Sequence, residues 1–168
     1  MTYQPRRGDY AVLATNGIAA RLIQIGDLSP WNHIINYIGE LPGYVGEWIV
    51  EAAPKGVRLV HISEYEGIAL AWNQHEPDVS DEQRNLIVEF LLAEVGKHYG
   101  FLIISYIVIR KLGLRLPRFL TAKLANYKGY ICSELSAAAW KHGQHILVAD
   151  TPIEFVTPRK LAVRLLYI

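Results

Sequence analysis

The chain has 168 residues, a formal net charge of +1 and a hydrophobic content of 51%. This length predicts one domain, over residues 1–168, and the hydrophobic content is enough for a core without metals or disulfides. The single cysteine excludes an internal disulfide, so nothing in the composition requires an oxidising compartment.

The first half of the chain predicts mainly strands. They lie at residues 11–14, 31–39, 47–53, 57–62 and 67–72. These runs are short, rich in β-branched and aromatic side chains, and separated by turns that contain glycine or proline. Between the first two runs, Asn16-Gly17 precedes a helix whose apolar face is formed by Ile18, Leu22 and Ile25.

The second half predicts mainly helices. Ser80 and Gln83 form a capping box that opens the first of them. The apolar run at residues 101–109 has nine residues, and because a bilayer crossing needs about 20, it predicts a buried helix instead. A helix of small residues is predicted at 133–141, and the runs at 146–148, 151–152 and 161–167 predict edge strands.

These elements predict an α+β fold, with an antiparallel sheet or small barrel packed against helices and a variable helical insertion around residues 100–128. Residues 1–7 lack the apolar core of a signal peptide, so we expect a soluble protein that is cytoplasmic as made. His142 and His145 have no further ligand beside them, and the sequence predicts no metal and no cofactor.

Cys132 stands directly before the helix predicted at residues 133–141. The unpaired N–H groups and the positive dipole end of a helix N-terminus favour a thiolate, which is the nucleophilic form. A lone cysteine is, however, more often a small buried side chain. A cysteine hydrolase needs in addition an imidazole that moves the proton and a polar group that orients the imidazole.

His33 and Glu51 can supply these two groups from neighbouring strands. A hairpin folded about Pro42 allows a register in which His33 stands directly opposite Glu51. His61, on the next predicted strand, is the competing base, since the other four histidines fall in loops or at helix ends.

Several segments occur in an order that is typical of one superfamily. They are Gly8-Asp9, Trp31-Asn32-His33, Ile49-Val50-Glu51-Ala52, Tyr99-Gly100, Tyr130-Ile131-Cys132-Ser133-Glu134 and Thr151-Pro152. In this order the chain resembles the circularly permuted NlpC-type papain-like cysteine hydrolases, a superfamily related to the lecithin–retinol acyltransferase-like enzymes. The resemblance spans most of residues 8–152, and the order His, Glu, Cys is the one that permutation implies.

The resemblance implies a papain-like fold in which Cys132 is the nucleophile, His33 the general base and acid, and Glu51 the orienting residue. It also implies an oxyanion hole that uses the backbone N–H of Cys132, with Tyr10 or Tyr130 as the second donor. The residues around Cys132 differ from the pattern of the acyltransferase branch, which favours the bacterial amidase-like side.

The sequence thus predicts a thiol-dependent amidase or peptidase that cleaves a peptide or cell-wall-type amide through a thioester acyl-enzyme. A first alternative keeps the same three residues but acts on lipid acyl esters; the basic residues Arg110, Lys111, Arg115 and Arg118 would then contact an anionic surface. A second alternative is a non-catalytic binding module on this fold. A nucleic-acid role ranks last, because no reading motif accompanies the basic segment.

Overall fold

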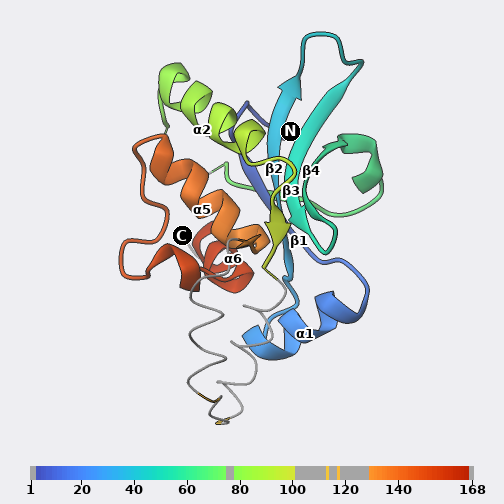
Figure 1. Ribbon diagram of the computed structural model, residues 1–168, viewed down its shortest axis with the longest axis vertical. Helices are drawn as coiled ribbons and strands as arrows, with labels where there is room; N and C mark the ends of the chain where they lie inside the picture. The colour runs from blue at the N-terminus through green and yellow to red at the C-terminus, as the bar shows by residue number, and fades with distance from the viewer. Residues whose placement is uncertain (1–2, 75–77, 101–112, 114–116, 118–128, 167–168) are drawn as a thin grey trace.

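The computed structural model describes residues 3–74, 78–100, 113, 117 and 129–166. In this part of the chain the protein is α+β, with a five-stranded antiparallel sheet and four α-helices (Figure 1). The helix predicted at 101–109 and nearly all of the 100–128 insertion lie outside the described residues, as do Arg110, Lys111, Arg115 and Arg118.

The sheet has the strand order β4-β3-β2-β1-β5. Its strands are β1 (Tyr10–Leu13), β2 (His33–Glu40), β3 (Glu47–Ala53), β4 (Gly56–His61) and β5 (Ala71–Trp72). All five predicted strand positions are confirmed, although β5 is shorter than the run that predicts it. Each pairing is antiparallel. Short turns join β2 to β3 and β3 to β4, whereas α1 lies between β1 and β2, and the chain from β4 to β5 runs through η1 between the two edges of the sheet.

The register that the sequence allows, with His33 directly opposite Glu51, is not the one that the β2–β3 hairpin adopts. Asn36 pairs with Val50, so the observed register differs by two residues from the one that would place His33 opposite Glu51. The loop between the strands contains Gly43 and Gly46, both at positive φ, and an irregularity between Tyr37 and Gly39 shifts the pairing once more. A local backbone conformation, which strand propensity does not report, therefore decides the register.

The helices are α1 (Ile18–Asp27), α2 (Asp81–Ala93), α5 (Cys132–His142) and α6 (Pro158–Leu166). Two 3₁₀ helices, η1 (Ile62–Tyr65) and η2 (Ile153–Phe155), and a parallel strand pair, β6 (His98–Tyr99) with β7 (Gly129–Tyr130), complete the described elements. None of the described helices is long and apolar enough to cross a bilayer.

The edge strands predicted at 146–148, 151–152 and 161–167 were wrong for the described residues, because 161–166 belong to α6 and the other two runs form no strand. Pro158 occupies the first turn of α6, a position where its missing N–H costs no hydrogen bond. Leu161, Ala162 and Leu165 recur at helical spacing and are all buried, so one face of this helix joins the core.

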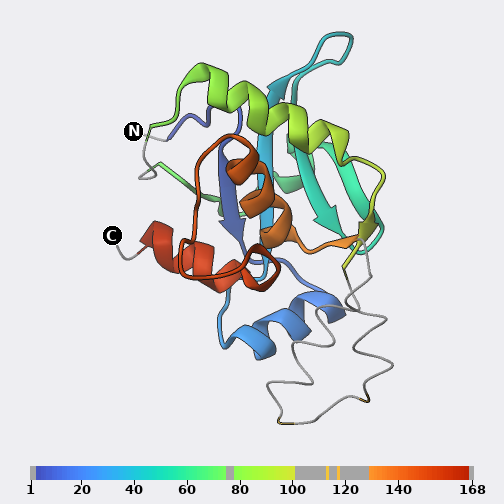
Figure 2. The ribbon, with the colours of Figure 1, turned by 60° about the vertical axis from the view of Figure 1, so that its left-hand side comes forward.

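α2 and α5 lie side by side on one face of the sheet, as both ribbon views show (Figures 1 and 2). Ile34 and Ile38 of β2 pack into the core beneath these helices. Ile35 and Tyr37, at the alternate positions, pack on the opposite face of the sheet in a smaller core that includes Tyr65 of η1. The sheet therefore separates α5 from η1.

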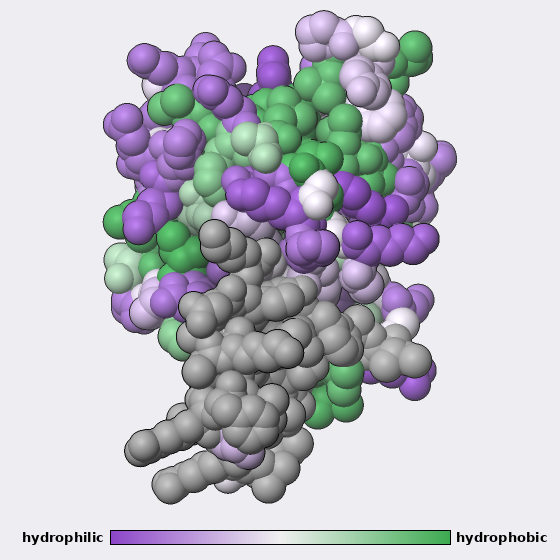
Figure 3. All heavy atoms as spheres, viewed as in Figure 1, coloured by the Kyte–Doolittle hydropathy of each residue, from purple (hydrophilic) through white to green (hydrophobic). Residues whose placement is uncertain are grey.

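The space-filling view shows how the surface of this face is divided (Figure 3). Hydrophobic side chains remain visible between α2 and the β2–β3 hairpin, with hydrophilic side chains around them. Partly buried Leu41, Leu59, Phe90 and Leu92 pack against the main core in this part of the molecule.

A buried ion pair joins α2 to the start of β1. Arg84 Nη1 lies 2.8 Å from Asp9 Oδ1, and the two side chains are 7% and 1% exposed. The same nitrogen donates to the Arg7 carbonyl at 3.0 Å. Removing one partner of such a pair leaves a buried charge without compensation, whereas an exposed pair contributes little.

We therefore expect Arg84→Met to lower the free energy of unfolding by about 3 kcal/mol. The matched control is Arg6→Met, because Arg6 pairs with Asp78 where both side chains are more than half exposed, and it should cost about 0–1 kcal/mol. Urea unfolding at neutral pH measures both values. Equal losses in the two variants would contradict the anchoring role of Arg84.

Candidate active site

Cys132 is the first residue of α5, and a set of side-chain hydrogen bonds fixes this helix to the sheet. Ser136, one turn later, donates to Asn36 Oδ1 on β2 at 2.7 Å. Asn36 Nδ2 in turn donates to the Val50 carbonyl on β3 at 3.1 Å. The start of the helix is thereby tied to the two strands that carry His33 and Glu51.

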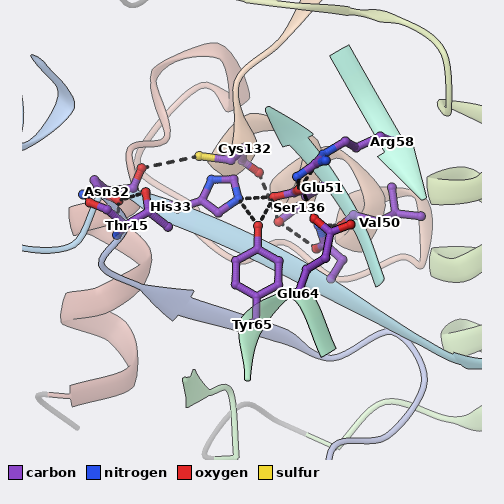
Figure 4. Close-up of polar contacts among 11 residues, drawn as sticks. Thr15, Asn32, His33, Val50, Glu51, Arg58, Glu64, Tyr65, Cys132 and Ser136 are labelled. Atoms are coloured by element: carbon purple, nitrogen blue, oxygen red, sulfur yellow. Dashed lines mark hydrogen bonds and ion pairs between the residues drawn. The ribbon is translucent and has the colours of Figure 1, made fainter. Parts of the chain in front are cut away.

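The His33 ring lies between the Cys132 sulfur and the Glu51 carboxylate (Figure 4). His33 is the first residue of β2, where the sheet ends, so its ring reaches both α5 and the side chains on the opposite face. A residue in the middle of β2 could face only one of these two cores. The three residues singled out from the sequence are therefore brought together, and the rejected register does not prevent it.

The Glu51 carboxylate is fully buried and contacts several donors at once. His33 Nε2 contacts Oε2, and the Tyr65 hydroxyl donates to the same oxygen at 2.5 Å. Arg58 binds the other oxygen through Nε at 2.8 Å and Nη2 at 2.6 Å. Both oxygens of the carboxylate are thus occupied by protein donors.

These contacts move the pKa values of both partners. Burial disfavours the charged imidazolium, but hydrogen bonding and charge from Cys132 and Glu51 outweigh it and raise the pKa of His33 to about 9. Burial likewise disfavours the Glu51 carboxylate, but the contacts with His33, Tyr65 and Arg58 outweigh it and lower its pKa to about 2. The geometry therefore favours an imidazolium beside a carboxylate at neutral pH.

A cleft of about 320 Å³ opens beside these residues. Its lining includes Thr15, His33, Glu51, Arg58, Tyr65 and Tyr99. Asn32 holds the loop that forms one wall, because its side-chain oxygen accepts from the backbone N–H and the hydroxyl of Thr15, each at 2.9 Å, and its amide donates to the Thr15 carbonyl at 2.9 Å. The cleft is a space in which a substrate can meet the imidazole.

The thiol itself is only 1% exposed, and its sulfur lies 3.9 Å from the Asn32 carbonyl oxygen. Such burial is also what a small packing side chain would show. The His33 imidazole beside the sulfur favours a reactive cysteine, because a cysteine that only fills space needs no such neighbour.

The two tyrosines expected as oxyanion donors do not line the cleft. Tyr10 is fully buried in the core and packs edge-to-face against Trp140. Tyr130 lies on β7, where burial and hydrogen bonding to Glu94 raise its pKa to about 12. These positions do not favour either tyrosine as a donor to a carbonyl bound in this cleft.

Tyr99 is better placed than either of them. It lines the cleft, it is 6% exposed, and burial together with the charges of Cys132 and Glu51 raises its pKa well above the ordinary value. The parallel pairing of β6 with β7 brings Tyr99 beside Tyr130 and so close to the start of α5. The sequence singled out the Tyr99-Gly100 segment, but it did not indicate that the Tyr99 side chain lines the cleft.

Sequence reasoning also missed Arg58 and Tyr65. Arg58 lies opposite Glu51 in the β3–β4 register, so correct pairing of these strands would have found it. Tyr65 lies on η1, a short helix after β4 with no strong sequence signal. The competing base His61 lies away from the cleft, where Nδ1 lies 2.7 Å from the Ser63 hydroxyl and the ring packs on Trp48.

Within the described residues, no group of three or more His, Cys, Asp and Glu side chains is arranged to hold a metal ion. No family model matches the chain, and no curated protein matches it.

Proposed function

We propose that the protein is a cysteine hydrolase that cleaves an amide, of the peptide or cell-wall type, through a thioester acyl-enzyme. The observation that carries the proposal is the chain of contacts from Cys132, at the start of α5, through the His33 ring to the buried Glu51 carboxylate. The same contacts support a papain-like arrangement of the fold, in which a helix carries the thiol and a strand carries the imidazole.

The first half of the proposed reaction forms the acyl-enzyme. The Cys132 thiolate attacks the carbonyl carbon of the amide, and the negative charge moves to the carbonyl oxygen. The backbone N–H of Cys132, at a helix N-terminus, stabilises this charge, and the Tyr99 hydroxyl is the second donor. The His33 imidazolium then gives its proton to the leaving amine as the carbon–nitrogen bond breaks.

The second half regenerates the Cys132 thiolate. Neutral His33 takes a proton from water, which attacks the thioester carbonyl, and the carbon–sulfur bond breaks to release the acid and the thiolate. The proton remains on His33, so the thiolate–imidazolium pair is restored. Glu51 holds the ring and stabilises its charged form in both halves.

Labelling with a thiol-reactive acyl probe, an acyloxymethyl ketone, tests this proposal. We expect wild type to be labelled at Cys132 and Cys132→Ser to remain unlabelled, because the less acidic hydroxyl is a weaker nucleophile. Peptide amides and lipid esters are then added as competitors. Protection by amides alone supports the amidase. Protection by esters alone supports an enzyme that uses the same three residues on lipid acyl esters. Absence of labelling in folded wild type supports a binding module.

A further inference from the structure

Tyr65 and His33 share one oxygen of Glu51. The Tyr65 hydroxyl donates to Oε2 at 2.5 Å and lies 3.3 Å from His33 Nε2, which contacts the same oxygen. Arg58 occupies the other oxygen, so the carboxylate cannot turn to offer His33 a second one. Tyr65 is 9% exposed, and its hydroxyl is buried at this contact.

Each donor to a carboxylate takes up part of its negative charge, and donors to the same oxygen compete. Burial and the nearby Glu51 charge raise the pKa of Tyr65 far above the ordinary value, so the phenol stays protonated and keeps donating throughout the working pH range. The imidazolium therefore always shares Oε2 with a second donor.

We propose that Tyr65 is a positioning residue that holds Glu51 through the oxygen it shares with His33 and limits how strongly this carboxylate binds the imidazolium. This inference rests on the proposed function. In the second half of that reaction His33 acts in its neutral form, and an imidazolium held too tightly by Glu51 would keep its proton. Tyr65 thus lets one carboxylate orient the ring without preventing its deprotonation.

No other described group around the His33 ring shares the Glu51 oxygen that the imidazolium contacts. In the described residues, the titratable or charged side chains around the site are Cys132 on α5, Glu51 on β3, Arg58 on β4, Tyr65 on η1 and Tyr99 on β6, with Glu64 of η1 paired to Arg58 at 3.4 Å. Among the hydrogen bonds of the described residues, Tyr65 is the only other donor to the oxygen that His33 contacts.

The test is the titration of the His33 ring, followed by ¹⁵N NMR, in wild type and Tyr65→Phe. Because one charge-assisted hydrogen bond to Oε2 is lost, we expect the pKa of His33 to rise by about one unit. Turnover should fall by about tenfold near neutral pH, where less of His33 is neutral, and recover as the pH passes the new pKa. A purely structural role of Tyr65 would not produce a loss that depends on pH.

The matched control is Tyr37→Phe, because Tyr37 is equally buried and also donates to a glutamate, Glu47, but lies outside the cleft. An unchanged or lower His33 pKa in Tyr65→Phe, or an equal rise in the control, would overturn the inference. Should Tyr65→Phe not fold, 3-fluorotyrosine at position 65 replaces it; this stronger donor should lower the His33 pKa, and no change or a rise would count against us.

The titration needs no substrate, so it separates the two proposals. A rise specific to Tyr65→Phe in a protein that the acyl probe does not label would leave the inference on Glu51 standing and remove the proposed function. Labelling with an unchanged titration would do the reverse.

Discussion

Replacing His33 with alanine is expected to lower turnover by at least about 10³-fold, because the thiol loses its proton acceptor and the leaving amine loses its proton donor. The variant should also react differently with iodoacetate. In wild type the imidazolium attracts this anion, so the alkylation rate should fall as the pH rises through about 9, where His33 loses its proton. Without His33 that decline should disappear, and the rate should rise with the ionisation of the thiol alone.

His61→Ala is the matched control, since His61 is the strand histidine on β4 and contacts Ser63 rather than Cys132. It should keep both the turnover and the alkylation profile of wild type. A similar loss in both variants, or an alkylation profile that His33→Ala leaves unchanged, would mean that Cys132 is a packing residue.

Glu51→Gln is expected to have the second largest effect, a loss of turnover of about 10²–10⁴-fold with the fold retained. The amide oxygen can still accept from His33 and Tyr65, while the amide nitrogen replaces the oxygen that binds Arg58. The Arg58 side chain is 42% exposed, so it can turn toward solvent. The imidazolium keeps its orientation but loses the negative charge that stabilises it.

The same variant should show a defined pH dependence of stability. The folded-state pKa of Glu51 is lowered to about 2, so its stabilising contribution is present above the unfolded value of about 4.3 and is lost as the pH falls toward about 2. Urea unfolding should therefore find Glu51→Gln less stable than wild type near neutral pH, with the difference shrinking in acid. If the difference in free energy of unfolding does not change with pH, the charge of the Glu51 carboxylate does not stabilise the folded protein.

Local signals predicted the elements well where a few neighbouring residues decide the outcome. The capping box at Ser80 and Gln83 is present, and α2 begins directly after Ser80. α5 begins at Cys132, and the Glu134 carboxylate accepts from the Ile131 N–H at 3.4 Å. Such signals failed for the strand predicted at 161–167, because Leu161, Ala162 and Leu165 lie at helical spacing and belong to α6.

The sequence by itself therefore determined the α+β class, the strands that carry His33 and Glu51, and the place of Cys132 at the start of a helix, because hydrophobic period and capping are local properties. Only the tertiary structure decided which side chains surround Glu51. Arg58 reaches it through the β3–β4 register, Tyr65 through the turn into η1, and Tyr99 comes close to the site through the β6–β7 pairing. These contacts depend on turn geometry and on packing between distant segments, which no local pattern of residues encodes.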